Sequence, residues 1–294
     1  TAKFALHTDR LDLRQIHGSM KPTKIAGDIA VANVGTTQTL DLRLNDAGLR
    51  LAARAKLANN VLDLSEARLS AGSGSIALSG SANLAEDKAF KVSANASRFN
   101  PAALGDYPQA DINANINAAG VLAPSWKVNA DFALRPSRLF DQPLSGRGKL
   151  AADAKHVSGV DATLALGQNS VDLRGAFGAP GEKLNWRVDG RQLAALRKDL
   201  YGSVVANGVV TGSMASPRTT FALDANGLGW VAAQRKANTS NLRANGEAWL
   251  AGGKEARFVE VKANGNMARF NPAAFGSPIP GSINGAFAAS GRSG

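Results

Sequence analysis

The chain has 294 residues, of which 44% are hydrophobic but only 6% aromatic, with 31 glycines and no cysteine. Without cysteine there are no disulfides and no thiolate chemistry. Since Ala and Gly supply much of the apolar count, we expect a thin, layered structure rather than a compact globule. The net charge of +11 is carried by Lys and Arg dispersed singly along the chain. This dispersion favours a solvated basic surface over a phosphate-binding one and argues against nucleic-acid binding, which needs clustered basic residues with stacking aromatics.

Alternation of apolar and polar residues with a period of two is the main structural signal. In chain order it is clearest at residues 40–45, 90–97, 112–117, 126–132 and 184–189. Successive side chains of a strand point to opposite faces, so each segment predicts a strand with one buried and one wet face. That pattern is typical of antiparallel sheets with one solvated side. We therefore expect an all-β fold.

The alternation changes parity in two places, and one segment has helical spacing. Leu62 and Leu64 share one parity while Ala67 and Leu69 share the other, which predicts a β-bulge near residues 65–66. A similar slip is expected where Phe258 is followed by Val259. Leu residues spaced three and four apart predict a short helix over residues 191–201. Otherwise we expect only very short helices.

An internal repeat organises the chain. The sequence RFNPAALG at residues 98–105 recurs as RFNPAAFG at residues 269–276, and a degenerate copy begins at Leu193. Each copy predicts a short helical turn followed by a strand, a glycine and another strand. In the two close copies Pro101 and Pro272 would begin the turn, and Phe99 and Phe270 would occupy equivalent places. We expect one elongated β-sheet segment over 1–294, cut from a longer protein, with internal modules starting near 99, 193 and 270.

No catalytic or metal-binding pattern stands out. The three histidines, His7, His17 and His156, are scattered, whereas a metal site usually needs three or four converging ligands. Motifs of phosphate-binding loops, metalloproteases and serine hydrolases are missing. We predict a protein that is not an enzyme and that binds no metal or cofactor.

The apolar face of such a sheet must be covered or used. A sandwich or a barrel would cover it, but many short strands can also form a meandering sheet curled into a U-shaped trough with an apolar interior. A contiguous exposed apolar strip usually marks a partner, and acyl chains would fit one. The residues expected to line this groove are Leu40, Leu42, Leu44, Ile76, Leu78, Phe90, Val92, Phe99, Ile112, Ile116, Trp126, Val128, Phe132, Leu164, Leu166, Leu173, Trp186, Val188, Phe221, Leu223, Leu242, Phe258 and Phe270.

A recurring order of motifs resembles the TamB family of translocation and assembly module subunits, within the wider AsmA-like group. The motifs lie at residues 144–150, 166–175, 184–188 and 193–196, followed by Gly212 and Pro217. The motifs are patterns of Leu and Gly. The resemblance covers nearly the whole chain and is to the middle of the family's periplasmic region.

The resemblance implies a fold, a location and partners. It implies a long U-shaped β-sheet, the β-taco, with a hydrophobic interior. It places the full-length parent in a Gram-negative bacterium, anchored in the inner membrane and crossing the periplasm. It implies phospholipid acyl chains as cargo and TamA, an outer-membrane partner of the Omp85 class, as partner through regions outside this chain. Membrane contact would also be made only by those regions.

The residues leave several functions open. The first is a hydrophobic conduit that carries phospholipid between the two membranes and supports outer-membrane biogenesis. The second is a chaperone or scaffold for outer-membrane β-barrel (autotransporter) assembly, acting in protein secretion by strand pairing. The third is a purely structural β-solenoid or stalk. A carbohydrate-active β-helix enzyme is disfavoured because no repeat carries clustered Asp, Lys and Arg.

Overall fold

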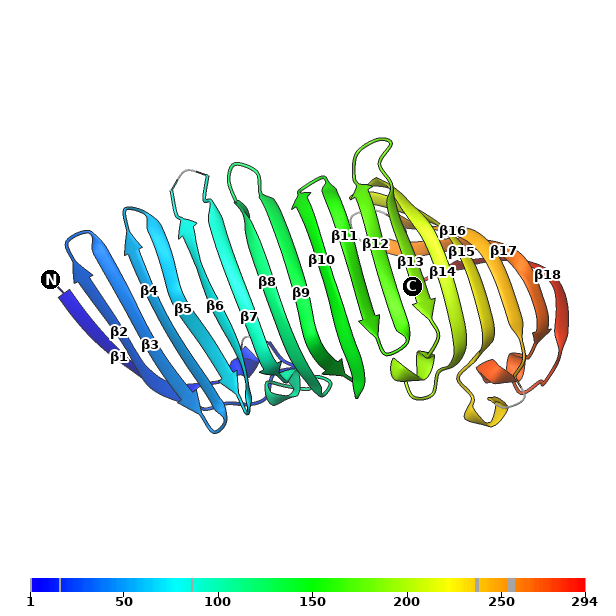
Figure 1. The fold of residues 1–294 in the computed structure, drawn as a ribbon, viewed down its shortest axis with the longest axis horizontal. Helices are drawn as coiled ribbons and strands as arrows, with labels where there is room; N and C mark the ends of the chain where they lie inside the picture. The colour runs from blue at the N-terminus through cyan, green and yellow to red at the C-terminus, as the bar shows by residue number, and fades with distance from the viewer. Residues whose placement is uncertain (1, 16, 86, 236–237, 253–256, 294) are drawn as a thin grey trace. The chain divides into compact units, whose positions relative to one another are not determined.

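The computed structural model describes residues 2–15, 17–85, 87–235, 238–252 and 257–293. These ranges form eighteen β-strands and five short 3₁₀ helices (Figure 1). The chain divides into two compact units, residues 1–154 and 155–294, which are described separately. Within the described ranges, no helix is long and apolar enough to cross a bilayer.

The described part of unit 1 is a meander of ten strands. They are β1 (Ala2–Leu11), β2 (Ile25–Val34), β3 (Thr37–Asp46), β4 (Leu49–Ala58), β5 (Val61–Ala71), β6 (Gly74–Asn83), β7 (Phe90–Phe99), β8 (Ala110–Val121), β9 (Lys127–Leu139) and β10 (Gln142–Asp153). Each strand pairs antiparallel with the next. The 3₁₀ helices η1 (Leu13–Gln15) and η2 (Pro101–Ala103) interrupt the meander.

Unit 2 repeats this plan with eight strands in its described part. They are β11 (Val157–Leu166), β12 (Asn169–Phe177), β13 (Leu184–Gly190), β14 (Tyr201–Ser213), β15 (Ser216–Gly229), β16 (Asn241–Gly252), β17 (Arg257–Phe270) and β18 (Ile283–Arg292). Consecutive strands are again antiparallel. The 3₁₀ helices are η3 (Leu193–Ala195), η4 (Ala232–Gln234) and η5 (Pro272–Phe275).

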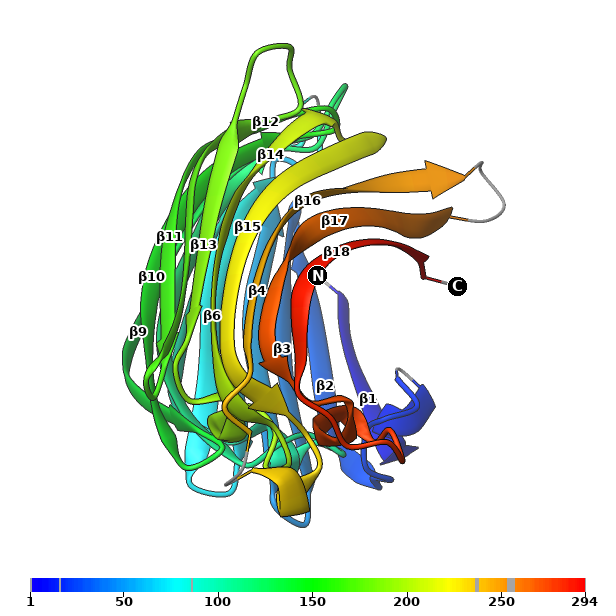
Figure 2. The ribbon, with the colours of Figure 1, turned by 90° about the vertical axis from the view of Figure 1, so that its right-hand side faces the viewer.

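The strands are curled, with one apolar and one polar face. Figure 2 shows β14–β18 bending along their length, so that both ends of each strand turn towards the same side. In β7 the side chains of Phe90, Val92 and Ala94 are half-buried, whereas Lys91 and Asn95 are exposed. The inner face is therefore the apolar one, as expected when side chains converge inside a curl. This confirms the predicted all-β, antiparallel, curled sheet with an apolar interior.

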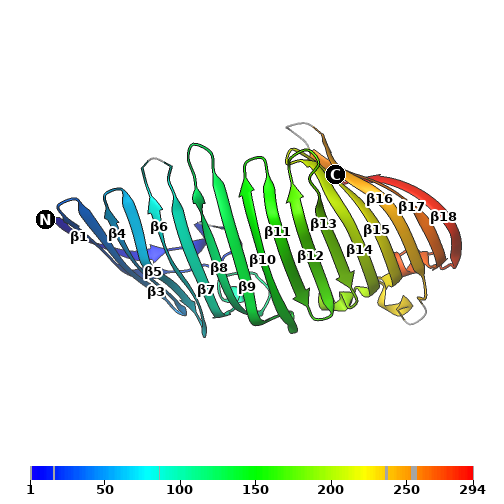
Figure 3. The same ribbon diagram turned by 45° about the horizontal axis from the view of Figure 1, so that its top comes forward.

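The two ends of the strands differ. In unit 1 the 3₁₀ helix η2, and in unit 2 the 3₁₀ helices η3–η5, lie at the strand ends that we call the turn end of each unit (Figures 1 and 3). Most of the buried apolar side chains lie near it: Ile25, Leu44, Ala71, Ala114, Leu193, Ala195, Tyr201, Ala225, Ala244, Ala273 and Ala274. We call the opposite end, with loops 35–36, 59–60, 84–89 and 122–126 in unit 1, the open end.

A β-bulge keeps the apolar face continuous where the sequence changes parity. The register of β5 shifts between Leu64 and Ala67, so that Leu64 pairs with Ala55 and Ala67 with Ala53. Both sides of the bulge thereby place small or apolar residues on the inner face. The bulge predicted at residues 65–66 is confirmed.

The two close copies of the predicted repeat begin with the same backbone, although η2 ends at Ala103 before a right-handed Leu104 and η5 continues to Phe275 before a left-handed Gly276. Asn100 begins η2 with φ −109° and ψ 106°, and Asn271 begins η5 with φ −110° and ψ 104°. Each Asn Oδ1 accepts a hydrogen bond from a backbone N–H of its own 3₁₀ helix, Ala102 or Ala273, at 3.1 Å. Phe99 pairs with Ile112 and Phe270 with Ile283, each after a register shift. The equivalence of Phe99 and Phe270 is confirmed.

The helix predicted over residues 191–201 is wrong. Only the single 3₁₀ turn η3 forms there, and Tyr201 already begins β14. An α-helix of that length would be about 16 Å long at 1.5 Å per residue. Here Gly190, the last residue of β13, must pair with Val204 in the next strand. A short turn satisfies that connection, so sheet pairing overrides the helical spacing.

The two capping asparagines should contribute measurably to stability. We expect Asn100→Ala or Asn271→Ala to lower the free energy of unfolding by about 1 kcal/mol each, the usual cost of losing an N-cap side chain. Urea unfolding followed by circular dichroism measures this. Gln192→Ala is the matched control, because Gln192 precedes η3 without a side-chain capping bond. Equal losses in all three variants would contradict the capping role.

Candidate functional site

The inner face of unit 1 carries continuous cross-strand rows of apolar side chains. The middle row comprises Leu6, Ile29, Leu42, Ala53, Ala67, Leu78, Ala94, Ile116, Phe132 and Gly148. The row nearer the open end comprises Phe4, Val31, Leu40, Ala55, Leu64, Gly80, Val92, Ala118, Ala130 and Leu150. Neither row contains a polar side chain. A strip of hydrocarbon and glycine therefore crosses all ten strands.

Unit 2 has equivalent rows on its own inner face. One comprises Leu164, Val171, Val188, Ala206, Leu223, Ala244, Gly265 and Phe287, and its neighbour comprises Ala162, Leu173, Trp186, Gly208, Phe221, Gly246, Ala263 and Ala289. Large side chains often stand opposite glycine or alanine along these rows. The rings of Trp186 and Phe221 lie over Gly208 and Gly246 of the next strand, so they fill the space that glycine leaves.

Much of this apolar surface is open to solvent. In unit 1, Ile116 in the middle of β8 is 48% exposed. In unit 2, Leu164 is 40% exposed although it is the third residue from the turn end of β11. Leu44, at the equivalent position of β3 in unit 1, is only 4% exposed. Among the described residues, no large side chain is fully buried. The inner face therefore exposes apolar side chains in both units, and in unit 1 it is packed near the turn end.

Trp186 shows how a polar atom is accommodated in this groove. Its ring lies over Gly208 of the adjacent strand, where an added Cβ would stand 2.7 Å from the ring. Its Nε1–H donates a hydrogen bond to Thr219 Oγ1, one strand further on, at 2.9 Å. The ring remains apolar surface while its donor is satisfied, as a half-buried Trp requires.

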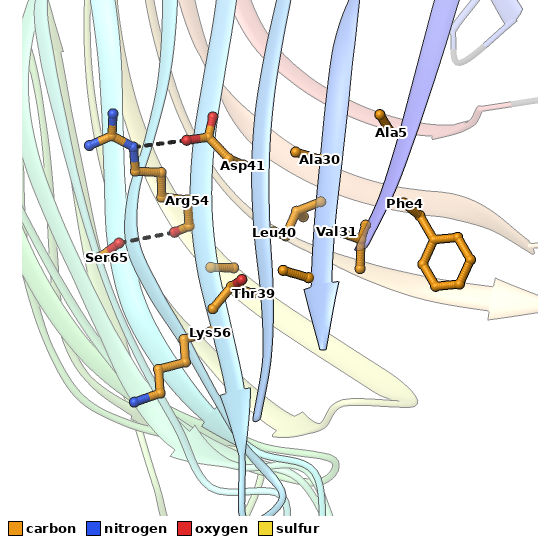
Figure 4. Close-up of a pocket in the computed structure, with 12 residues that line it drawn as sticks. Phe4, Ala5, Ala30, Val31, Thr39, Leu40, Asp41, Arg54, Lys56 and Ser65 are labelled. Carbon is orange, nitrogen blue, oxygen red and sulfur yellow. Dashed lines mark hydrogen bonds and ion pairs between the residues drawn. The ribbon is translucent and has the colours of Figure 1, made fainter. Parts of the chain in front are cut away.

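The outer face carries the charges. Figure 4 shows Arg54 beside Asp41, and their Nε–Oδ2 distance is 3.4 Å. Arg43 also pairs with Asp41, at 3.2 Å. A depression of about 590 Å³ over β1–β5 includes these charged groups with Thr39 and Lys56 in its lining. Its lining also includes Phe4, Val31, Leu40 and Ala55, which belong to the row nearer the open end.

Shifted pKa values occur only beyond the apolar rows, within the described part of the chain. A side-chain hydrogen bond from Arg14 lowers the pKa of Asp12 to about 2. The backbone N–H of Ala179, helped by His156, lowers the pKa of Glu182. Both carboxyls lie in segments that connect strands. The described residues also contain no group of three or more His, Asp or Glu placed to hold a metal ion.

Most of the predicted groove residues lie on the inner face of their own unit, either in the rows described above or in the neighbouring rows. In unit 1 they are Leu40, Leu42, Leu44, Ile76, Leu78, Phe90, Val92, Phe99, Ile112, Ile116, Val128 and Phe132, and in unit 2 they are Leu164, Leu166, Leu173, Trp186, Val188, Phe221, Leu223, Leu242 and Phe270. That these residues bind lipid stays a prediction.

Two predicted positions differ. Trp126 precedes β9 and lies in an open-end loop instead of the strand. Phe258 pairs with Ala251 without the expected register slip, so it shares the outer face with Glu260. The Arg292 guanidinium carbon lies 3.2 Å from the centre of the Phe258 ring. This cation–π contact gives the ring a partner on the polar side.

Several inner-face residues were not predicted from sequence. Phe4, Val31, Leu150 and Phe287 complete the rows. Val31 stands opposite Leu40 and Leu150 opposite Ala130, both in strands that alternate clearly, so the cross-strand partner is the signal that finds these two. Phe4 lies in the alternating segment 2–6.

A family comparison agrees with this architecture. The model described as "TamB, N-terminal domain" matches residues 37–252, most of the chain. The chain therefore belongs to the TamB family. TamB proteins are inner-membrane-anchored, periplasm-spanning subunits of the translocation and assembly module, in which their partner is TamA. The match is to the family's N-terminal domain, whereas the sequence motifs resembled the middle of its periplasmic region. No curated protein and no solved structure gives a significant match.

The open and packed parts of the inner face should respond differently to charge. Ile116→Asp should change the free energy of unfolding by less than about 1 kcal/mol, because water reaches the new carboxylate. Leu44→Asp should cost about 4 kcal/mol or more, because the charge would be buried without a partner. Urea unfolding of both variants measures the contrast, with Asn115→Asp on the outer face of the same strand as control, because Oδ1 of residue 115 still accepts from Asn95 Nδ2. Equal destabilisation at Ile116 and Leu44 would mean that the groove is closed.

Proposed function

We propose that the inner face is a conduit for phospholipid, on which acyl chains lie while the molecule moves between the inner and outer membranes. The observation that carries the proposal is the continuity of the exposed apolar rows across consecutive strands in each unit. Soluble proteins seldom expose contiguous apolar patches beyond a few hundred Å², and such patches usually have a partner. The role is one of binding and transfer without catalysis.

The spacing of the rows suits acyl chains. Adjacent rows are two residues apart along a strand, which is about 6.8 Å. An extended hydrocarbon chain fits between two such rows and can contact side chains from both. Because the rows run across the strands, a chain lying between them would be directed from each strand to the next. Movement along the sheet would then exchange one apolar contact for another.

The apolar rows favour a lipid over a polypeptide cargo. A scaffold that acts by strand pairing would use backbone groups at a sheet edge and would gain little from a hydrocarbon strip. A purely structural sheet would gain stability by covering that strip. Here Ile116 stays exposed in the middle of β8, and the paired residues Leu164 and Val171 stay exposed in unit 2.

Charge placed on the rows should block transfer without unfolding the protein. In the full-length parent, we expect Leu164→Asp and Val188→Asp each to slow phospholipid transfer between the membranes at least tenfold. A barrier of about 1.4 kcal/mol is enough for that effect, and an ion in apolar surroundings costs more. Asn185→Asp, on the outer face of β13 opposite Arg174, is the matched control.

The readout is phospholipid exchange in cells whose own copy has been deleted, with a melting curve of the 294-residue chain alongside. Folded Leu164→Asp and Val188→Asp variants with normal transfer would remove the conduit function from this segment. Normal β-barrel assembly combined with lost transfer would separate the lipid role from the scaffold role.

A further inference from the structure

Two loops at the open end of unit 1 form one composite surface. Loop 84–89 joins β6 to β7, and loop 122–126 joins β8 to β9. The backbone N–H groups of Leu122 and Ala123 both donate to the carbonyl oxygen of Asp87, at 3.1 and 3.0 Å. The loops are therefore held together although more than thirty residues separate them in sequence.

This surface exposes large apolar side chains. Leu84 is 49% exposed, Leu122 is 54% exposed and Trp126 is 40% exposed. The apolar residues Phe90 and Val128, which both pair with Gly120 on the inner face, follow within a few residues. The apolar surface of the groove is thus continuous with the loops at its open end.

The same surface carries three lysines without an acidic partner. Lys88, Lys91 and Lys127 are exposed, and among the described residues none of them makes an ion pair. Elsewhere on the outer face, some arginines are paired with carboxylates, as Arg43 and Arg54 are with Asp41. The nearby carboxylate of Asp87 accepts the backbone N–H of Ala89, at 3.0 Å.

Lysines on the outer face can reach this surface because they lie at the ends of their strands. Lys91 and Lys127 project from the face opposite to Phe90 and Val128, but Lys91 is the second residue of β7 and Lys127 is the first residue of β9. Long aliphatic stems can bend around apolar groups and leave the ammonium in water. A tryptophan beside lysines and leucines is the composition found where a protein meets lipid headgroups.

From this arrangement we infer that the surface formed by residues 84–85, 87–89 and 122–126 with Lys88, Lys91 and Lys127 binds the headgroup of an anionic glycerophospholipid. The acyl chains of that lipid lie on the adjoining row at Val92 and Ala118. The inference rests on the proposed lipid conduit and adds a preference among its cargoes. A headgroup with a net negative charge is held by three ammonium groups, whereas a zwitterionic headgroup places its own ammonium against them.

The test compares two variants of the whole chain with equal loss of charge. The first is Lys88→Gln, Lys91→Gln and Lys127→Gln together. The control is Lys24→Gln, Lys149→Gln and Lys198→Gln, exposed lysines outside the two loops. Each protein is incubated with vesicles of equal parts phosphatidylglycerol and phosphatidylethanolamine and re-isolated. The bound lipids are then quantified by mass spectrometry.

We expect the wild-type protein and the control to carry at least threefold more phosphatidylglycerol than phosphatidylethanolamine. The loop variant should lose that preference while its total bound lipid stays within twofold of the wild type. An unchanged preference, or an equal loss in the control, would overturn the headgroup site and leave the conduit intact. Wild-type protein that carries no lipid would overturn the conduit itself, and the headgroup site with it.

Discussion

The structure depends on one constraint, the antiparallel register that aligns the apolar positions of each strand with those of the next. A shift of one residue would turn a whole strand's apolar set to the outer face. The bulge between Leu64 and Ala67 prevents such a shift in β5, and similar irregularities precede Phe99 and Phe270. Local alternation thereby becomes a strip that extends from strand to strand.

Glycine and the 3₁₀ turns decide how much of this strip stays open. Near the turn end, the asparagine-capped turns are set against the strand ends, and side chains such as Leu44 and Ala274 are buried there. In the middle of the strands, rings such as Trp186 lie over glycine on the neighbouring strand instead of meeting a facing layer. Stability comes from the packed end and the backbone ladder, which leaves the remainder of the face available for a ligand.

Sequence predicted the features that depend on short-range patterns. Alternation at residues 90–97 placed Val92 and Ala94 on the inner face, and the parity change at residues 65–66 located a bulge. The RFNPAA repeat predicted two equivalent 3₁₀ turns. These succeed because strand facing and capping are set by neighbours in the chain.

The failures have long-range causes. Phe258 lies on the outer face because β16 and β17 pair without a register slip, and Arg292 of the next strand contacts its ring there. The segment at residues 191–201 stays out of helix because β13 must pair with β14. The composite surface of loops 84–89 and 122–126 arises from a backbone contact between separate hairpins. No single strand's pattern contains that information.

The central claim is that acyl chains lie on the inner face, and site-specific photo-cross-linking tests it most directly. A photoreactive side chain at Ile116 faces the groove, while one at Asn117 faces outwards from the same strand. Introduced into the full-length protein in cells and irradiated, the Ile116 probe should form adducts with phospholipid and the Asn117 probe should not. Equal labelling at both positions, or no lipid adduct at Ile116, would contradict the account.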